Sequence, residues 1–435
     1  MSATFSSLKY RNYRLWFTGA LVSNIGTWMQ RVGQDWLVLT QLTHNSGVAL
    51  GAVTGLQFAP ALFVSPFAGV LADRMNRRKL LLITQASMGA LAAVLGALVM
   101  SGQVRLWHVY ALALALGVAS AFDAPVRQTF VAQLVPKEKL ANAVGLNSAS
   151  FNAARLIGPG VAGLLIAAIG TGWLFWLNAA SFGWTILALV LMRSSELHAM
   201  PMVPRSKGQI RAGLAYVRGR PDILVIMVVV GVVSAFGLNF QMTSALIART
   251  VFHKGAGEYG LLGSVLAIGS LSGALIAARR EHPRVRLVVG AALGFGVAAS
   301  LLAVMPTYLT YAVLCVPVGL ASLTMMTAAN ATIQMSTEPQ MRGRVMALYM
   351  MVFQGATPIG SPIVGWIGQQ FGARWAIGIG GITAVLVAVA ALLWVGRSMH
   401  VRVRYRPDEH PRLQVTCPTE NVLPSARDLG ARSAV

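Results

Sequence analysis

Long apolar segments, separated by short polar ones, follow one another along most of the 435-residue chain. Each apolar segment extends over roughly 20 residues, the length that a helix needs to cross a bilayer. The segments lack the alternation of apolar and polar residues that membrane strands require, so the pattern predicts helices. We predict twelve membrane-spanning helices, at 15–41, 48–72, 80–101, 106–131, 141–169, 173–192, 223–248, 258–279, 287–305, 308–335, 344–369 and 373–396.

The polar segments divide the chain into regions. The longest internal one, 193–222, separates two groups of six predicted helices. We therefore expect an N-terminal six-helix bundle at 1–192 and a C-terminal six-helix bundle at 223–396, followed by a disordered tail at 397–435.

Apolar residues also recur at helical spacing inside the linker. Ile210, Leu214 and Val217 lie on one face, with arginines nearby. This pattern predicts a short amphipathic helix that lies on the membrane surface.

The two predicted bundles are related in sequence. An offset of 202 residues aligns Phe151 with Phe353, Gly158 with Gly360, Gly163 with Gly365, Gly170 with Gly372 and Trp173 with Trp375. Identities at one offset indicate a duplicated six-helix unit. Parallel repeats of this kind are typical of transporters with a binding site between the two halves.

Composition narrows the class of protein. Apolar residues make up 56% of the chain and charged residues 11%, whereas a soluble domain carries about 25% charged residues. The net charge is +22, but so few charges argue against a surface that binds nucleic acid. Two cysteines exclude a disulfide framework. The composition therefore indicates an all-helical membrane protein.

The distribution of Lys and Arg predicts the orientation. With the N-terminus in the cytoplasm, only four of the 35 basic residues fall in outer loops, and Arg31 and Arg155 lie inside predicted helices. The others fall in segments that then face the cytoplasm, as the positive-inside rule requires. We expect both termini to be cytoplasmic and the basic loops to face anionic phospholipids.

Three ionisable side chains, Arg31, Asp35 and Arg155, lie deep within the predicted spans. Such residues are costly in a membrane and mark functional sites. Arg31 and Asp35 are one helical turn apart and are expected to pair directly, and Arg155 lies at a similar depth in the fifth span. We hypothesise that Asp35 carries protons with the two arginines as partners. A structural ion pair is the alternative interpretation.

The segment after the second span carries a longer motif, G-V-L-A-D-R-M-N-R-R. It resembles the G-x-x-x-D-R-x-G-R-R signature of the major facilitator superfamily, with Asn76 replacing the glycine; asparagine tolerates the left-handed conformation. The stretches G-T-W-M-Q at 26–30 and D-A-P-V-R at 123–127 are similar to bacterial exporters of the enterobactin and macrolide-efflux subgroup. The signature residues are Gly69, Asp73, Arg74, Arg77 and Arg78.

This resemblance implies a conformational lock near the cytoplasmic ends of the helices. Asp123 and Arg127 lie in the fourth span, and Asp123 is expected to pair with an arginine of the signature loop, Arg77 being the first candidate. Asp73 is expected to face the N-terminal end of the eleventh helix, where the helix dipole favours a carboxylate. A purely structural loop anchor is the alternative.

The fifth span carries Gly158, Pro159 and Gly163, similar to the G-P-x-x-G-G motif of drug:proton antiporters, with Ala162 in place of one glycine. These residues permit close helix approach and a bend, so packing and gating are both open interpretations. Amide side chains in the spans provide hydrogen bonds either to a substrate or between helices. These substrate-cavity candidates are Asn24, Asn152, Asn239, Gln241, Asn330, Gln334 and Gln354.

We predict a secondary active transporter of the bacterial plasma membrane that works by alternating access. Proton-coupled export of a small amphiphilic compound, a drug or a siderophore, is the preferred function. An importer or uniporter is one alternative, and a non-transporting receptor or scaffold is another. The sequence has no phosphate-binding P-loop and no catalytic constellation, so no enzyme activity, cofactor, metal or nucleic acid is expected. A monomer suffices for this function.

Overall fold

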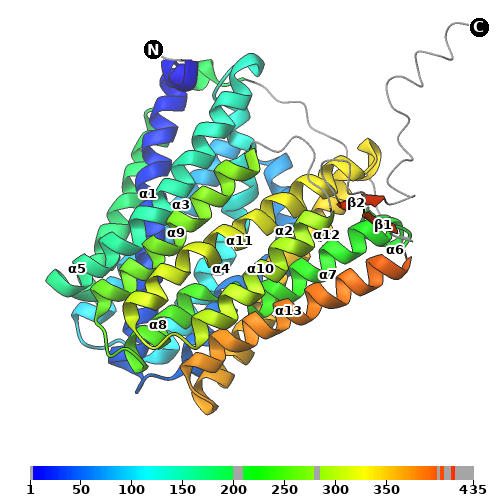
Figure 1. The fold of residues 1–435 in the computed structure, drawn as a ribbon. Coiled ribbons are helices and arrows are strands. Elements are labelled where there is room, and N and C mark those ends of the chain that lie inside the picture. Colours follow the sequence, from blue (N-terminus) through cyan, green and yellow to red (C-terminus); the bar gives the residue numbers. More distant parts are fainter. Residues whose placement is uncertain (1–2, 199–208, 279–284, 399–401, 406–412, 417–435) are drawn as a thin grey trace, which may run out of the picture.

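The structure is a computed structural model in which long helices lie side by side in one bundle (Figure 1). It describes residues 3–198, 209–278, 285–398, 402–405 and 413–416. Side chains are described for these residues except 3–4, 65–74, 209–210, 277–278, 395–398 and the two strands.

The N-terminal half consists of five long helices and several short turns. The turns are η1 (Ala3–Lys9), the π-helical η2 (Val38–Leu42), η3 (Val131–Gln133), η4 (Lys137–Lys139) and η5 (Ser194–Glu196). The long helices are α1 (Arg11–Leu37), α2 (Gly47–Arg74), α3 (Arg77–Met100), α4 (Leu106–Phe130) and α5 (Leu140–Val190).

Helix α5 contains a sharp break at Gly170, where φ is +81°. This left-handed conformation favours glycine, because other L-residues clash there. Gly372, 202 residues later, has φ +97° between the last two helices. The same turn therefore recurs at the same place in both halves.

The C-terminal half begins with the linker helix, α6 (Gln209–Arg218), which packs against α12. The half then continues with α7 (Pro221–Phe236), α8 (Phe240–Thr250), α9 (Ala256–Ala278), α10 (Val285–Ala303), α11 (Tyr308–Ser336), α12 (Pro339–Gln370) and α13 (Ala373–Ser398).

The predicted span at 223–248 corresponds to one apolar stretch of membrane length, Pro221–Thr250, but a break that was not predicted divides it into α7 and α8. The Asn239 side chain at this break donates to the Ala235 carbonyl at 2.6 Å. The tail predicted to be disordered contains two antiparallel strands, β1 (Arg402–Tyr405) and β2 (Leu413–Thr416). Their short runs include the valine, tyrosine and threonine residues that strands favour.

Membrane-length helices dominate the part of the chain that the structure describes. Nine stretches there are long and apolar enough to cross a bilayer, including a 54-residue stretch at Lys137–Val190. Many leucine, valine and tryptophan side chains on these helices are exposed, as expected where lipid takes the place of water.

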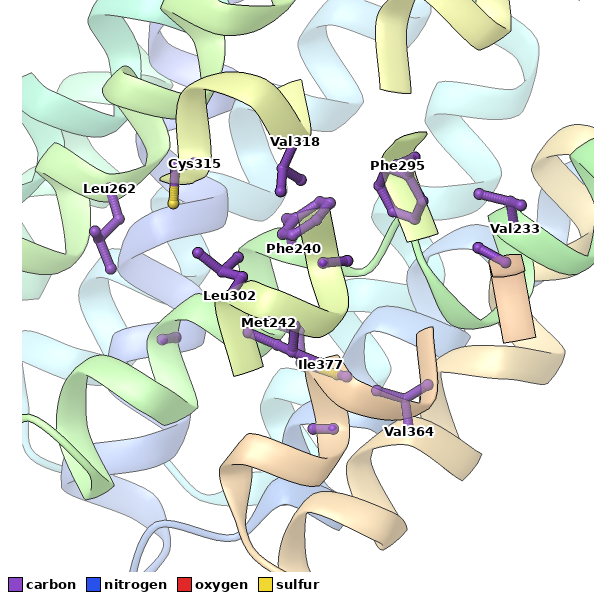
Figure 2. Close-up of a cluster of buried hydrophobic side chains, with 14 of the residues drawn as sticks. Val233, Phe240, Met242, Leu262, Phe295, Leu302, Cys315, Val318, Val364 and Ile377 are labelled. Carbon is purple, nitrogen blue, oxygen red and sulfur yellow. The ribbon is translucent and has the colours of Figure 1, made fainter. Parts of the chain in front are cut away.

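A large apolar cluster lies in the interior of the C-terminal half and continues into the N-terminal half. Figure 2 shows side chains from α7 to α13 meeting in one cluster that includes Val233, Met242 and Ile377. Phe240 and Phe295 lie at its centre, with ring centroids 5.8 Å apart in an edge-to-face arrangement. Such dense packing holds the seven helices together through dispersion contacts.

The two halves touch toward the far end, which we define as the end of the bundle where α1 ends and α9 begins. Two seams join them: α2 packs along α12, and α5 packs along α9. Among the described residues, the hydrogen bonds that cross between the halves all lie on this side of the bundle. They join Ser46 and Val48 to Gln369, Leu156 to Ser264, and Asp35 to Tyr259.

Candidate functional site

Asp35 lies near the far end of α1 and is buried, with 7% of its surface exposed. Its Oδ2 accepts a hydrogen bond of 3.1 Å from the hydroxyl of Tyr259 on α9. The expected direct ion pair between Asp35 and Arg31 is not formed. Among the described residues, no ion pair joins these two side chains. The carboxylate instead bonds across the contact between the halves.

Arg31 and Arg155 share an aromatic neighbour. The guanidinium carbon of Arg31 lies 4.8 Å from the ring centroid of Trp28 and 5.4 Å from that of Phe58. The guanidinium carbon of Arg155 lies 5.7 Å from the same Trp28 ring. Cation–π contacts of this kind stabilise a guanidinium away from water. The two arginines come together as expected, but around a tryptophan.

Arg31 also lines a small polar cavity inside the N-terminal half. The space open to the centre of a water molecule is about 20 Å³, enough for roughly one water. At its wall, Asn178 on α5 donates to Gln30 on α1, and Gln34 lies 3.5 Å from the Gln57 amide oxygen. The cavity therefore connects the buried cation to a chain of amides on α1, α2 and α5.

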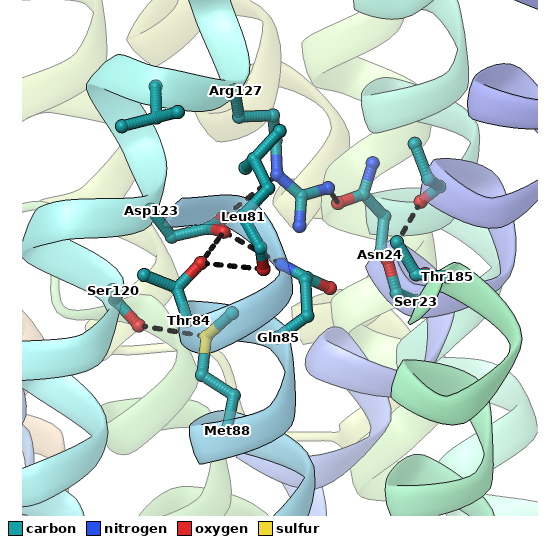
Figure 3. A network of polar contacts seen from close by, with 12 residues as sticks. Ser23, Asn24, Leu81, Thr84, Gln85, Met88, Ser120, Asp123, Arg127 and Thr185 are labelled. Carbon is teal, nitrogen blue, oxygen red and sulfur yellow. Dashed lines mark hydrogen bonds and ion pairs between the residues drawn. The ribbon is translucent and has the colours of Figure 1, made fainter. Parts of the chain in front are cut away.

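A second polar network lies in the same half, farther from the far end than Arg31 and Asp35 (Figure 3). The Asp123 carboxylate accepts hydrogen bonds from Thr84 at 2.8 Å and Gln85 at 2.7 Å, both on α3. Arg127, one turn along α4, donates to Asp123 at 2.9 Å and to Asn24 of α1 at 3.3 Å. This network ties three helices together around one buried carboxylate.

The expected pair between Asp123 and Arg77 is therefore replaced by one with Arg127. The Nε atom of Arg77 is buried without a hydrogen-bond partner. Arg78 donates to the carbonyls of Leu189 at 2.7 Å and Val190 at 3.0 Å, so it caps the end of α5. The side chains of Gly69, Asp73 and Arg74 lie outside the described residues.

The glycine–proline motif of α5 lies in the seam with α9. The backbone stays helical through Gly158, Pro159 and Gly163. A Cβ atom added to Gly163 would come within 2.5 Å of the Ala256 carbonyl oxygen and 3.0 Å of the Gly257 Cα. The motif thus lets two backbones approach closely.

The duplicated motif does the same in the other seam. A Cβ atom on Gly365 of α12 would collide with the Gly47 carbonyl oxygen, and one on Gly51 would meet the Pro362 Cα at 3.1 Å. The two seams are therefore related by the sequence repeat, with each half supplying one glycine–proline helix.

The candidate amides are spread over several environments. Of the seven, only Asn330 and Gln334 bond to each other among the described contacts. Asn152 donates to the Ser148 carbonyl of its own helix at 2.9 Å, and Gln354 is exposed. The Gln241 side-chain nitrogen is buried without a partner. The structure does not gather these amides into one pocket.

From the sequence we predict no role for Trp28, Gln30, Asn178 or Tyr259, and Trp28 and Gln30 enter only within the G-T-W-M-Q stretch. Tryptophan and tyrosine are common in membrane helices, so composition gives no signal for Trp28 and Tyr259. Gln30 and Asn178 are polar residues in apolar spans and could have been singled out by that criterion. Tyr259 and Trp28 matter only through the neighbours that the fold gives them.

The chain is similar to known proteins over most of its length. A family model described as "Transmembrane secretion effector" matches residues 2–419. The chain is 24% identical to the staphyloferrin A transporter of Staphylococcus aureus, covering 90% of this chain and 98% of that protein. It is 27% identical to the multidrug efflux pump Tap of Mycolicibacterium fortuitum, covering 81% and 88%.

The fold also matches solved structures. One is a bacterial homologue of the human lysosomal transporter Spinster in an inward-facing, occupied conformation. The TM-score is 0.69 at 15% identity, with 89% of this chain and 97% of that one covered. The arrangement of helices is therefore that of known membrane transporters.

Proposed function

The chain belongs to the transmembrane secretion effector family of the major facilitator superfamily, and from this premise we propose that it exports a small amphiphilic compound in exchange for protons. Its family makes it a multi-pass transporter of the bacterial plasma membrane, with small-molecule substrates, and not an enzyme. The names of its relatives, a siderophore transporter and a multidrug efflux pump, support a siderophore or a drug as the substrate class.

The observation that carries the proposal is the buried carboxylate of Asp35 at the contact between the halves. A titratable group there can bias two arrangements of the halves, because its charge is stabilised differently in each. Arg31, one turn away, and Arg155 supply positive charge to the same region. Asp35 is the proton carrier in this proposal, and the arginines tune its charge.

The proposed topology has twelve spans with both termini in the cytoplasm. Dividing the 54-residue apolar stretch at Gly170, and adding α1 and α12, brings the nine apolar stretches of the described residues to twelve. Helices α1 and α12 are less apolar than the nine membrane-length stretches, as suits helices that face a polar pathway. The far end is then extracellular, so the closed seams correspond to an inward-facing arrangement.

In this cycle, the halves rock about a central site near the middle of the membrane. The signature loop and Asp123 belong to a lock that closes the cytoplasmic side when the far end opens. Of the candidate amides, Asn330 and Gln334 on α11 bond to each other, and in this proposal these two contact the substrate. A monomer in an anionic bilayer is sufficient.

The test is transport in vesicles with an imposed pH gradient, using a panel of siderophores and drugs. We expect the native protein to accumulate at least one compound against its gradient. Asp35→Asn should abolish this accumulation but leave equilibration down a substrate gradient, because the variant keeps the polar group and loses only the titration.

Glu196→Gln is the matched control. It removes one carboxylate from an exposed pair with Arg193 in the linker, and such pairs contribute little to stability. Its accumulation should equal that of the native protein. Unchanged proton-driven transport in Asp35→Asn would overturn the carrier role, and transport indifferent to the gradient in the native protein would favour a uniporter.

A further inference from the structure

We propose that Tyr259 couples the charge of Asp35 to closure of the far end. In this inference Tyr259 is a positioning residue that holds the two halves together while Asp35 is ionised, and it lets them separate when Asp35 takes up a proton. The inference rests on the proposed function in one respect: it takes Asp35 as the proton carrier.

The geometry gives the Tyr259 hydroxyl two competing acceptors. One is the Asp35 carboxylate in the N-terminal half, at 3.1 Å, and the other is the backbone carbonyl of Gln241 on α8, at 3.2 Å. A phenol has a single hydrogen to donate, so it serves one acceptor well at a time. The first bond crosses between the halves, whereas the second stays within the C-terminal half.

The charge of Asp35 decides which acceptor is favoured. A hydrogen bond to an ionised carboxylate is roughly twice as strong as one between neutral groups. An ionised Asp35 therefore attracts the hydroxyl across the contact. A protonated Asp35 loses this advantage, and the Gln241 carbonyl becomes an equal or better acceptor. Protonation thus weakens the bond between the halves relative to the one inside the C-terminal half.

Tyr259 lies beside the seam between α5 and α9, so a change in its hydrogen bond affects the packing of that seam. Its side chain is only 1% exposed, and its ring stacks on Trp36 of α1 with centroids 6.0 Å apart and planes at 18°. The next residue, Gly260, packs directly against the Pro159 carbonyl oxygen of α5. A close-packed seam shifts as a unit, so movement of Tyr259 is transmitted to the contact between α5 and α9.

Among the described residues, few other charged groups act on this pair. Arg31, on the same helix, is the charged neighbour of Asp35, and Arg155 of α5 in turn acts on Arg31. The carboxylate of Glu258 accepts from the Gly255 amide at 3.1 Å, at the start of α9. The direction follows from the Asp35 charge: high pH favours closure of the far end, and low pH favours its opening.

The bond acts on the unloaded carrier whose far end is closed. While Asp35 is ionised, the Tyr259–Asp35 bond holds this species closed at the far end. Tyr259→Phe, which keeps the stacked ring and removes the hydroxyl, should therefore free the far end to open without unfolding the carrier.

The experiment measures the separation of the halves by pulsed spin–spin distance measurements in lipid nanodiscs, with no substrate present. His44 and Phe371 are exposed, one in each half beside the far end, and H44C and F371C provide the label sites once Cys315 and Cys417 are replaced by Ala. In the otherwise native protein, the long-distance population should rise at least threefold between pH 8 and pH 5.

In Tyr259→Phe, we expect the long-distance population to be high at both pH values. Its rise between pH 8 and pH 5 should be at least three times smaller than in the otherwise native protein. Asp35→Asn should behave in the same way. Tyr349→Phe is the control, because this buried hydroxyl donates to the Met326 carbonyl within the C-terminal half. It should retain the native pH response.

The outcomes separate the two proposals. A native pH response in Tyr259→Phe, together with its loss in Asp35→Asn, would overturn the role of Tyr259 and leave the proton carrier intact. A protein without any pH response before substitution would contradict Asp35 as the carrier, and with it this inference. Loss of the response in Tyr349→Phe as well would show a general effect of removing hydroxyls and would also overturn the role of Tyr259.

Discussion

The two halves share a scaffold but differ in what fills it. The N-terminal half contains a carboxylate network around Asp123 and an amide cavity beside Arg31 (Figure 3). The C-terminal half is filled with aliphatic and aromatic side chains (Figure 2). Its described carboxylates, Asp222, Glu258 and Glu338, lie at helix starts.

This difference indicates a division of roles within a duplicated fold. The glycine–proline seams and the turns at Gly170 and Gly372 are common to both halves, so the duplication preserved the geometry of contact. Among the described residues, both buried carboxylates, Asp35 and Asp123, lie in the N-terminal half, whereas the buried polar residues of the C-terminal half are hydroxyls and one amide, Asn239. The groups whose charge can change inside the protein are therefore on one side of the contact.

Removing the Asp123 carboxylate, the shared acceptor of the N-terminal network, should have the largest effect on stability. Asp123→Ala leaves Thr84, Gln85 and Arg127 without their shared acceptor, and breaking a buried ion pair costs about 3–5 kcal/mol. We expect a strong fall in melting temperature in detergent. Asp123→Asn, which retains an acceptor, should lose less. Equal melting temperatures for the native protein and Asp123→Ala would show that the Asp123 network does not stabilise the N-terminal half.

Disturbing a seam should have the next largest effect. Gly163→Ala forces a methyl group against the Ala256 carbonyl, and such overpacking costs about 1–3 kcal/mol. The far end should open, which the label pair at positions 44 and 371 would detect. Gly145→Ala is the control on the same helix, since a Cβ there meets nothing within 4 Å. An opened far end in Gly145→Ala would contradict the seam's role.

Removing the cap of α5 should have a moderate effect. Arg78→Ala loses hydrogen bonds to the Leu189 and Val190 carbonyls, and we expect a loss of about 0.3–1 kcal/mol, typical of a cation at a helix C-terminus. Arg78→Lys should recover part of this loss. If Arg78→Ala keeps full stability but loses transport, Arg78 belongs to the conformational lock and not to the scaffold.

A matched pair of threonines tests the comparison most finely. Thr84 donates to Asp123, whereas the buried hydroxyl of Thr324 in α11 has no hydrogen-bond partner. Thr84→Val should cost about 1.5–3 kcal/mol, because its bond is to a charged group. Thr324→Val should instead stabilise the protein by about 1 kcal/mol or more, because it removes a buried hydroxyl that has no partner among the described residues. Similar losses in the two variants, measured by thermal unfolding, would mean that the halves do not differ in this respect.

Much of the fold could be predicted because its signals are local. The helices follow from apolar runs, and the break at Gly170 falls in the gap predicted between two spans. The break between α7 and α8 was missed because Leu238 and Phe240 on either side of Asn239 keep the segment apolar. The hairpin in the tail was missed because a polar composition masks two short runs of strand-forming residues.

The candidate site could be predicted only as a set of residues. Asp35, Arg31 and Arg155 stand out in the sequence because charge is rare in membrane helices. Their partners do not, because helical spacing suggests Arg31 for Asp35 and the fold selects Tyr259. Likewise, Asp123 pairs one turn along its own helix, although the family resemblance directs attention to Arg77.

The sequence by itself determined that this chain is a duplicated helical transporter, which charges lie in the membrane, and where close helix approach is possible. These properties depend on segment length, residue type and spacing along one helix. The tertiary structure alone decided the contacts of those charges. Tyr259 and Asp35 are 224 residues apart and lie in different halves. They meet only because two glycine-lined seams bring the halves together, and no local pattern encodes a contact made between two separately formed bundles.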